Sequence, residues 1–492
     1  MEEGEITALL RSVMQDILLD RHGRFPLYAQ IYRQIRGQIL RGHLLAGMKL
    51  PPSRQLAANL GVARVTVTQA YEQLQAEGYV IGRTGAGMFV AEGLAEEDRP
   101  GEEERPFTPI LSRWGKRVLA AEGETAVTTP RPPIDFGFGR SFAQIFPYDV
   151  WRRLLARYLS TDDAMLSRYG SVAGFYPLRE ALADYLSRER GVRCAPEQVV
   201  IVSGAQQVLD ILARLLLNPG DEALVETPGY TVAYDLLRVY GAKLVGLPVD
   251  DEGFPVELIP ADSRARLAFV TPTHQFPRGG TMSLARRLRL LSWAREHETL
   301  IIEDDYDGEL RYNGRPLAAL QGLDDEGRVA YLGTFSKVLF PALRLAYVVL
   351  PPALLTPFVQ AKSLVDRGAP TLTQAAVADF ITEGHFERHL RQLRLAYGRR
   401  REVLVTALER HLPGRVRYAP VAAGLHVMVY LEPGLVETAV VQQAAAAGVG
   451  VYPGAPYHLE QPAPPSILLG FSGLEEAEIE EGVRRLTAVL GM

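Results

Sequence analysis

The sequence is poor in cysteine and has no long apolar run. Cys194 is the one cysteine among 492 residues, which excludes an intrachain disulfide and a cysteine-rich metal site, and no metal is predicted. No stretch of about 18 apolar residues is free of charges, so no membrane span is expected. The opening MEEGEITALLRSVMQDILLDRHGR starts acidic and lacks an apolar core, unlike a secretory signal. A reducing cytoplasm is therefore the expected location.

Acidic residues are scarce between Arg24 and Ala91, although the whole chain has a net charge of −5. This segment has eight lysine and arginine residues against two glutamates, which gives it a net charge of +6. Residues 95–105 then read AEEDRPGEEER, and residues 128–133 read TTPRPP. The contrast predicts a basic domain over 1–91 and an acidic, proline-containing linker over 92–133, with one short helix around Trp114 to Ala121.

From Ile134 onward, short β-branched runs alternate with helical stretches. QVVIVSG, TLIIEDD and RVAYLGTFS are strand-like, whereas AQQVLDILARLLLN and SLARRLRLLSWAREH are helical. This alternation predicts an α/β domain over 134–492, with a mainly parallel sheet that has helices on both faces. Ligands of such sheets bind beyond the carboxyl ends of the strands. A basic helix from about Gly384 begins a smaller α+β subdomain, predicted over about 384–492.

The basic N-terminal segment has the pattern of three short helices. The first has an apolar residue at every fourth position: Leu27, Ile31, Ile35 and Ile39. A second helix is expected to begin at Arg54 with Ser53 as its N-cap. A third follows the turn at Gly61, over Arg64 to Glu77, and its inward stripe is Val67, Ala70, Tyr71 and Leu74. The second and third helices form a helix-turn-helix, whose later helix fits the major groove of DNA.

A hairpin is predicted after the third helix. VIGRTGAGMFVA has two strand-like runs around Arg83, which suits a contact with phosphates. With LPPSRQLAANLGV and TVTQAYEQLQAEGYV, it resembles the winged helix-turn-helix of the GntR family. That resemblance implies double-stranded operator DNA as a partner, contacted through Ser53, Arg54, Arg64, Thr66, Thr68 and Arg83. The family usually has serine where this chain has Ala63, so an N-cap worth about 1 kcal/mol is expected to be missing.

A hydroxyl-rich turn in YLGTFSKVLFPALRLAYVVLP presents Lys337 at the end of a strand-like run. Lysine forms a Schiff base with an aldehyde cofactor. Thr334, Ser336 and Arg344 suit a phosphate dianion, through hydroxyl groups and a guanidinium. A second anion site is predicted in VVIVSGAQQVLDILARLL. There the backbone N–H groups of Ala205 and Gln206 open a helix directly after a strand.

Two further strand ends supply groups for a pyridine ring. TLIIEDDYDGEL delivers Asp304, with Asp305 as the alternative, to keep a ring nitrogen protonated. Tyr306 follows and suits donation to a phenolate oxygen. ETPGYTVA places Tyr230 where its aromatic ring stacks on a planar cofactor. Taken singly, these residues are also typical of helix caps, ion pairs and apolar cores, so the prediction depends on their combination.

The four strand ends together resemble fold-type I aminotransferases, from about Ile134 to the end of the chain. A GntR-like head fused to such a domain is the architecture of the MocR family of regulators. The resemblance implies pyridoxal 5′-phosphate bound to Lys337, with Arg344 at its phosphate. It also implies that Tyr169 reaches the phosphate of a neighbouring subunit, in a homodimer that is domain-swapped head to tail.

Two departures from the aminotransferase pattern affect substrate recognition. SILLGFSGL has Leu468 where those enzymes carry an arginine for the substrate carboxylate, and leucine forms no such pair. The enzyme loop NPxxPTG is replaced by TPTHQFPRG. The roles of Gln275 and Arg278 in this loop are open, and His274 is open between a ligand contact and a structural role.

These features predict a DNA-binding transcriptional regulator rather than an enzyme. Its effector is expected to be pyridoxal 5′-phosphate or an amino compound, in the control of vitamin B6 or amine and amino-acid metabolism. The cofactor is slightly favoured as effector, because its contacts look complete and the carboxylate contact does not. One alternative is an active aminotransferase with an appended DNA-binding head, and partial reactions stay open because Lys337 is intact. Another is a structural dimer with a degenerate, empty site.

Overall fold

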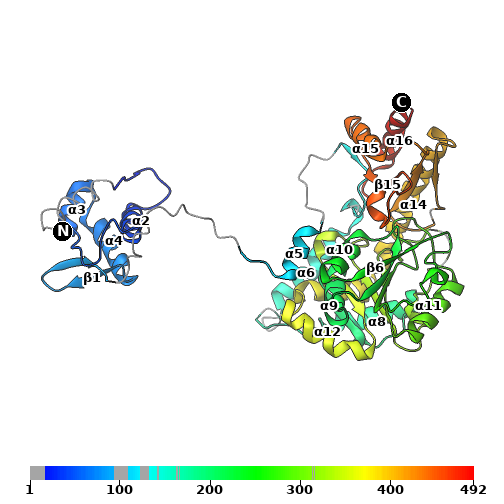
Figure 1. The fold of residues 1–492 in the computed structure, drawn as a ribbon, viewed down its shortest axis with the longest axis horizontal. Helices are drawn as coiled ribbons and strands as arrows, with labels where there is room; N and C mark the ends of the chain where they lie inside the picture. The colour runs from blue at the N-terminus through cyan, green and yellow to red at the C-terminus, as the bar shows by residue number, and fades with distance from the viewer. Residues whose placement is uncertain are drawn as a thin grey trace. The chain divides into compact units, whose positions relative to one another are not determined.

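The computed structural model describes residues 17–92, 109–121, 132–140, 143–161, 165, 167–312, 314, 316–420 and 422–491. The chain divides into two compact units, residues 1–110 and 111–492, and each is described by itself (Figure 1). Most of the acidic linker predicted over 92–133 lies outside the described residues. Within the described ranges, no helix is both long and apolar enough to cross a membrane.

The described residues of the first unit form a head of three helices with a two-stranded hairpin. Its elements are α2 (Leu27–Leu40), α3 (Ser53–Leu60), α4 (Arg64–Ala76), β1 (Val80–Arg83) and β2 (Gly87–Val90). The buried positions of α4 are the predicted Val67, Ala70, Tyr71 and Leu74. They share a core with Ile31, Ile35 and Ile39 of α2 and with Leu56 of α3. The predicted winged helix-turn-helix is therefore confirmed.

Both helix starts in the helix-turn-helix lack a side-chain cap. Ser53 is the first residue of α3 rather than its cap, so the predicted capping role of Ser53 is wrong. Pro52 stands at the N-cap position with φ −54° and ψ 139°, a conformation that leads directly into a helix. Ala63 is the N-cap of α4 and makes no capping hydrogen bond, as the missing serine predicts.

The second unit is built on a seven-stranded sheet in the order β4-β10-β9-β8-β7-β5-β6. All neighbouring strands are parallel except β10, which is antiparallel to both β4 and β9. The mainly parallel sheet is thus confirmed. The strand bounds are β4 (Val199–Val202), β5 (Glu222–Thr227), β6 (Lys243–Pro248), β7 (Leu267–Val270), β8 (Leu300–Asp305), β9 (Val329–Thr334) and β10 (Ala346–Val349).

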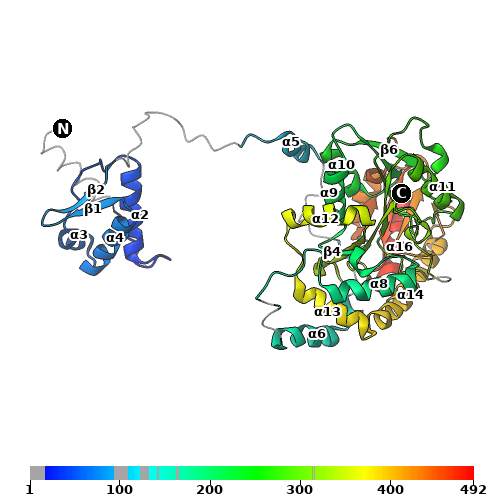
Figure 2. The same ribbon diagram turned by 90° about the horizontal axis from the view of Figure 1, so that it is seen from below.

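Helices cover both faces of this sheet because its strands are apolar on both faces. Along β10, Val348 packs with one cluster and Tyr347 with another. On the side of Val348 lie α9 (Ala205–Leu216), α10 (Thr231–Tyr240) and α12 (Pro352–Val365) (Figure 2). The opposite face carries α8 (Tyr176–Arg190), α11 (Leu284–Glu296) and α13 (Thr371–Thr382). Before α8 in the chain comes α6 (Tyr148–Thr161), which packs against α13.

The short helix predicted within the linker, around Trp114 to Ala121, is present as α5 (Arg113–Ala120). It packs against α10, with Trp114 and Tyr240 ring centroids 6.4 Å apart and Arg117 Nε donating to the Val239 carbonyl at 2.5 Å. This helix is therefore part of the second unit and not a free segment of the linker.

A smaller subdomain follows α13, as predicted. It contains α14 (His385–His411), α15 (Glu437–Ala446) and α16 (Glu476–Leu490) beside an antiparallel sheet in the order β11-β12-β15-β14. These strands are β11 (Val416–Tyr418), β12 (His426–Leu431), β14 (Tyr452–Pro453) and β15 (Ser466–Gly470). A separate pair joins β13 (Val449–Gly450) to β3 (Ile134–Asp135) in parallel. The first residues of the α/β region therefore pack in the C-terminal subdomain.

Candidate functional site

A cavity of about 250 Å³ lies at the carboxyl ends of the strands of the large sheet. Nine of the residues predicted to hold a cofactor line it together: Ala205, Gln206, Tyr230, Asp304, Tyr306, Thr334, Ser336, Lys337 and Arg344. They come from four strand ends, which converge because parallel strands end at one edge of a sheet. The other lining residues are Phe138, Gly204, Thr271, Phe276 and Pro341.

Lys337 lies in the turn after β9 and is half-buried. Its Nζ lies 4.4 Å from the ring centroid of Phe138. Burial lowers the pKa of the Lys337 ammonium, although the carboxylates of Asp307 and Asp304 oppose this shift. A lowered pKa increases the fraction of neutral amine, the form that reacts with an aldehyde.

One end of the cavity is suited to a phosphate. Ala205 and Gln206 are the first residues of α9, whose N-terminus favours an anion. The Arg344 guanidinium lies beside Gly204, where an added Cβ would be 3.0 Å from Nη2. Arg344 has φ +49°, a left-handed conformation that is uncommon for a residue with a side chain. Thr334 Oγ1 accepts a hydrogen bond from the Ser336 amide at 3.1 Å, which orders the turn before Lys337.

Asp304 and Asp305, both offered by the sequence as partners of a ring nitrogen, face different surroundings. Asp304 lines the cavity, and burial raises its pKa to about 8, helped by the nearby Asp305 and Asp307 carboxylates. Asp305 Oδ2 is instead bound by Arg190 Nη2 at 2.5 Å and Nε at 2.9 Å, and by the Tyr331 hydroxyl at 2.6 Å. Asp305 is therefore already used inside the fold, and Asp304 is the acid that faces the cavity.

Tyr306, which lines the cavity, contacts the buried His274 behind it. The Tyr306 hydroxyl lies 3.0 Å from His274 Nδ1, and the same nitrogen lies 2.9 Å from Asp307 Oδ2. His274 is 3% exposed and is not a lining residue of the cavity. Its contacts therefore position the Tyr306 side chain. Of the two roles left open for His274, a ligand contact or a structural role, these contacts favour the structural one.

The other polar residues of the TPTHQFPRG loop also serve the fold. Gln275 Nε2 donates to Glu226 Oε2 at 3.1 Å and to the Pro228 carbonyl at 2.8 Å. Burial raises the pKa of Glu226 to about 7, against hydrogen bonds from Thr271 and Gln275. Thr271 lines the cavity with its neighbour in the loop, Phe276, whose amide donates to Thr271 Oγ1 at 3.0 Å.

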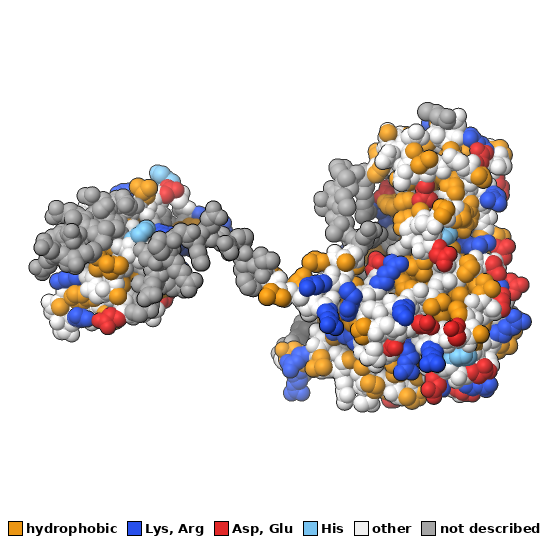
Figure 3. All heavy atoms as spheres, in the orientation of Figure 1, with side chains coloured by type: hydrophobic (Ala, Val, Ile, Leu, Met, Phe, Trp, Pro, Cys, Tyr) orange, Lys and Arg blue, Asp and Glu red, His pale blue; other side chains and the backbone are white. Residues whose placement is uncertain are grey.

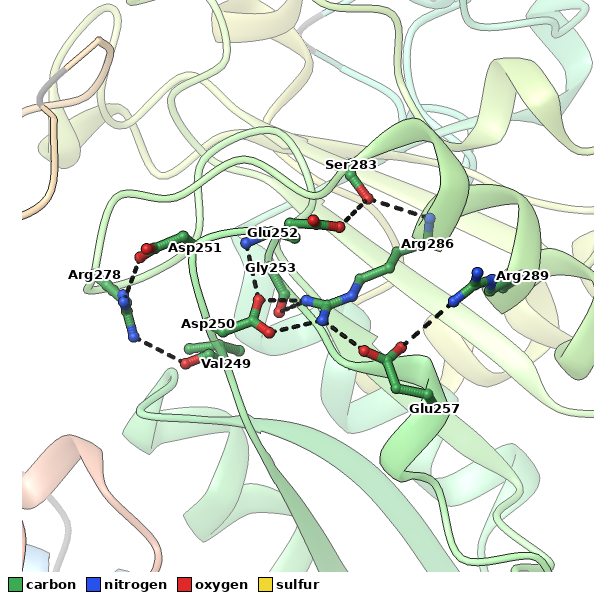
Figure 4. Close-up of polar contacts among 10 residues, drawn as sticks. All are labelled: Val249, Asp250, Asp251, Glu252, Gly253, Glu257, Arg278, Ser283, Arg286 and Arg289. Carbon is green, nitrogen blue, oxygen red and sulfur yellow. Dashed lines mark hydrogen bonds and ion pairs between the residues drawn. The ribbon is translucent and has the colours of Figure 1, made fainter.

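Arg278 points away from the cavity, toward the segment after β6. Figure 4 shows its guanidinium reaching Asp251 Oδ1 at 2.5 Å and the Val249 carbonyl at 3.0 Å. The same segment is held by Arg286 of α11, which binds both carboxylate oxygens of Asp250 and Oε1 of Glu257 at 2.6 Å. The Arg278 contacts thus tie the TPTHQFPRG loop, which also carries Phe276, to the segment after β6.

Leu468 lies on β15 and is 1% exposed. It forms an apolar cluster with Phe276, Tyr306 and Met428, and Phe138 packs against this cluster. The neighbouring strands place Met428 and Tyr452 beside it in register. The position at which aminotransferases carry the carboxylate-binding arginine is therefore occupied here by a leucine in an apolar cluster.

Tyr169 is the predicted cofactor residue that the structure does not bring into this cavity. Its side chain is 84% exposed, and the Arg367 guanidinium lies 5.6 Å from its ring centroid. A role toward a neighbouring subunit needs such exposure, and it stays a prediction.

Sequence reasoning missed several lining residues. Thr271, Gly204 and Phe276 belong to strand-end segments that it had singled out, so their positions carried a signal. Phe138 had none, because its segment is held by contacts with the distant C-terminal subdomain, among them the pairing of β3 with β13.

The residues lining the cavity fit a phosphate-bearing pyridine aldehyde. A Cβ at Gly139 would lie 2.7 Å from Lys337 Nζ, so glycine keeps the space beside this amine open. Asp304 is a buried acid that forms no ion pair within the described part of the chain, and a protonated pyridine nitrogen would supply a cation beside it. The phosphate-binding end, at Arg344 and the start of α9, and Lys337 lie at the same edge of the sheet.

The head presents a second candidate site on the outer face of α4. Arg64 is exposed, and its Nε donates to Ser53 Oγ at 3.3 Å. Thr68 Oγ1 donates to the Arg64 carbonyl at 3.1 Å, and Thr66 is half-buried. Arg54 of α3 is exposed beside this face.

The hairpin adds the remaining predicted DNA contact. Arg83 ends β1, and its guanidinium lies 4.8 Å from the Phe89 ring centroid. By contrast with the basic head, the face of the second unit seen in Figure 3 has acidic and basic side chains interspersed. The excess of positive charge is a feature of the head segment.

Two protein families match the chain. Residues 27–90 match "Bacterial regulatory proteins, gntR family", and residues 135–486 match "Aminotransferase class I and II". The first match covers the head from α2 to β2, and the second covers the strand-end cavity and the smaller subdomain.

Relatives of known name share the whole architecture. The chain is 39% identical over 476 residues to the "Probable rhizopine catabolism regulatory protein MocR" of Rhizobium meliloti, covering 96% of this chain and 95% of the relative. It is 30% identical to the pyridoxine biosynthesis transcriptional regulator PdxR of Corynebacterium glutamicum, covering 95% and 98%.

A solved aminotransferase shares the fold of the second unit. LysN, the α-aminoadipate aminotransferase of Thermus thermophilus, is 31% identical with a TM-score of 0.71, covering 77% of this chain and 97% of LysN. That structure holds N-(5′-phosphopyridoxyl)-L-leucine. The second unit is thus a pyridoxal-phosphate-dependent fold, as predicted.

Proposed function

The chain belongs to the MocR-type regulators of the GntR family, and from that premise we propose that occupancy of the Lys337 cavity controls operator binding by the head. The family membership makes the chain a DNA-binding regulator fused to a domain that uses pyridoxal 5′-phosphate. The coupling between the two units is the new element. It requires the ligand to favour one arrangement of the protein over another.

The observation that carries the proposal is that nine of the predicted cofactor-binding residues line one cavity. Lys337 supplies the amine, Asp304 the acid for the ring nitrogen, and Arg344 with the N-terminus of α9 the phosphate contacts. Tyr230 and Tyr306 flank the ring position, and Thr334 and Ser336 add hydroxyl groups. When bound, the cofactor's aldehyde forms a reversible imine link to a lysine or to a competing primary amine.

The proposed effector is pyridoxal 5′-phosphate itself or an amino compound that binds beside it. The names of two relatives agree with these classes, one concerning pyridoxine biosynthesis and the other rhizopine catabolism. The cofactor is the favoured effector, because Leu468 leaves no arginine for an amino acid's carboxylate. Control of vitamin B6 or of amine and amino-acid metabolism follows as the proposed role.

The proposed assembly is a homodimer, domain-swapped head to tail, with Tyr169 completing the partner's phosphate site. The exposure of Tyr169 supports this proposal. The domain boundaries at 91 and 133 and the cytoplasmic location also stay predictions.

Operator binding measured with and without pyridoxal 5′-phosphate tests the coupling. We expect the cofactor to change the affinity of the full chain for its operator by about fivefold or more. In Lys337→Ala this response should be lost, while the affinity of the cofactor-free protein stays as in the parent. Equal operator affinity with and without cofactor, at concentrations that saturate the visible absorbance of the bound cofactor, would overturn the proposal.

A working aminotransferase is the second candidate, because Lys337 and Asp304 are both intact. The apolar cluster around Leu468 speaks against turnover with common amino acids. Repeated turnover of an amino acid with a keto acid acceptor would rank this candidate first. A single partial reaction would leave the regulator in place.

A further inference from the structure

The cavity has no cation to spare for a carboxylate. Among the described residues that line it, the cationic side chains are Lys337 and Arg344. The first is committed to the cofactor's aldehyde and the second to its phosphate in the proposed function. Two other arginines near the site are held elsewhere, since Arg140 pairs with buried Asp135 at 2.6 Å and Arg278 pairs with Asp251 (Figure 4).

The wall beside Lys337 is aromatic and apolar. Phe138 and Phe276 line the cavity with ring centroids 5.1 Å apart, and Phe276 lies 6.0 Å from the Tyr230 ring. Behind Phe276 lie Leu468 and Met428, both 1% exposed. This wall offers a surface for an apolar group and no partner for an anion.

A carboxylate against this wall would lose its hydration without gaining a counter-ion, which is strongly unfavourable. An aromatic ring would instead bury apolar area against Phe138 and Phe276 and gain favourable ring packing. The physical chemistry of the wall therefore separates amines from amino acids of the same side chain.

We infer that the amine-binding position of this site selects primary amines that have an apolar or aromatic body and no carboxylate, with Phe276 and Leu468 as the selecting residues. Leu468 acts through Phe276 and through the absence of charge at its position. The inference rests on the proposed function, because it names the class of amino compound that enters the same cavity.

The test compares 2-phenylethylamine with L-phenylalanine, a pair that differs by the carboxylate alone. Each is titrated into the full chain loaded with pyridoxal 5′-phosphate, and binding is followed by the change in the cofactor's visible spectrum and by calorimetry. We expect 2-phenylethylamine to bind about 100-fold more tightly or better. Equal affinities, tighter L-phenylalanine, or no response to either ligand would overturn the inference.

Two variants locate the selectivity. Leu468→Arg should reverse the preference toward L-phenylalanine, whereas Leu468→Met, which keeps an apolar side chain, should keep the parent's preference. Phe276→Ala should weaken 2-phenylethylamine by about tenfold and leave methylamine, which has no body to pack, unchanged. Because Leu468→Arg buries a charge, its folding is checked by the cofactor spectrum, and Phe276→Ala keeps the inference testable if that variant does not fold.

These outcomes are distinct from failure of the proposed function. If the parent chain bound no pyridoxal 5′-phosphate, or if the bound cofactor left operator affinity unchanged, the proposed function would fail. If cofactor and operator were coupled but Phe276→Ala and Leu468→Arg left the ligand preference unchanged, the selectivity inference alone would be wrong.

Discussion

Asp304 and Asp305 are neighbours on β8, yet the first lines the Lys337 cavity and the second is bound by Arg190 inside the fold. Side chains alternate between the two faces of a strand, so consecutive acids are separated by the thickness of the sheet. Burial raises the pKa of Asp304 to about 8, although the nearby Lys337 ammonium opposes this shift. Asp305 is instead paired with the buried Arg190 guanidinium.

The first prediction is that substitutions at these two positions give opposite phenotypes. Asp304→Asn removes the partner of the pyridine nitrogen and should weaken pyridoxal 5′-phosphate binding by about 10- to 100-fold, without lowering the free energy of unfolding. Asp305→Asn leaves the Arg190 guanidinium buried without its counter-charge and should cost about 3 kcal/mol in unfolding free energy. Cofactor titration and denaturant unfolding of both variants measure the contrast, and matching phenotypes would refute the assignment.

The second prediction concerns Lys337. Lys337→Ala should abolish the visible absorbance band of the lysine-linked cofactor, because no other described lining residue carries a primary amine. The exposed Lys243 provides the control, and Lys243→Ala should keep the band. A band of unchanged intensity in Lys337→Ala would mean that the cofactor is attached elsewhere.

The parts of the site that the sequence predicted are those written in local patterns. Each strand-end group follows an apolar run directly, and parallel strands bring their carboxyl ends together whatever the details of packing. Lys337, Asp304 and Tyr230 could therefore be placed in one cavity from sequence alone. The stripe of α4 was equally local, since Val67, Ala70, Tyr71 and Leu74 share one face of a helix.

The parts that it missed depend on contacts between distant segments. Phe138 enters the cavity through the pairing of β3 with β13, which no pattern around residue 138 indicates. The structural role of His274 depends on Asp307 and Tyr306, which come from a different strand end. Ser53 was expected as a cap, but α3 begins one residue earlier than expected, at Ser53 itself, and the Ser53 hydroxyl accepts from Arg64 instead.

The third prediction addresses the DNA-binding face of the head. If Arg64 contacts a base, Arg64→Ala should weaken operator binding by about 1–3 kcal/mol. If Arg64 contacts a backbone phosphate, the variant should reduce the slope of log affinity against log salt concentration by about 1. The cofactor spectrum should be unchanged. Arg152 on α6, with 76% of its side chain exposed, is the matched control, and Arg152→Ala should bind as the parent does. Mobility-shift assays over a range of salt concentrations separate the two outcomes, and parent-like affinity at every salt concentration would exclude Arg64 from the interface.

The fourth prediction is that the missing N-cap of α4 can be restored. Ala63 is extended, with φ −65° and ψ 142°, the conformation in which serine caps a helix. Ala63→Ser should therefore stabilise α4 by about 1 kcal/mol, seen as slower hydrogen exchange of its amides in the full chain. Ala63→Gly should have a smaller effect, since it offers no side-chain oxygen. Faster exchange in the serine variant would show that its hydroxyl disturbs the turn after Gly61.

The last prediction is a loss of stability on the alkaline side, traced to Glu226. Burial raises the pKa of this carboxyl from 4.5 to about 7, so the native state holds its proton more tightly than the unfolded state does. Stability from this group is therefore complete below about pH 4.5 and is lost as the pH rises through about 7. Glu226→Gln cannot ionise, so its unfolding free energy relative to the parent should rise by on the order of 3 kcal/mol between about pH 5 and pH 9.

Substitution of Glu180 by glutamine provides the control for Glu226, because it removes a carboxyl that is exposed rather than buried. Burial also raises the pKa of Glu303 and Glu309 to about 7 and that of Asp304 to about 8, so these acids share the parent's alkaline decline with Glu226. Glu226→Gln should thus reduce the decline without removing it. Since Glu226 accepts from Thr271, which lines the cavity, the same variant should also loosen cofactor binding. A constant difference between Glu226→Gln and the parent from pH 5 to pH 9 would mean that this carboxyl is ionised throughout in the folded protein.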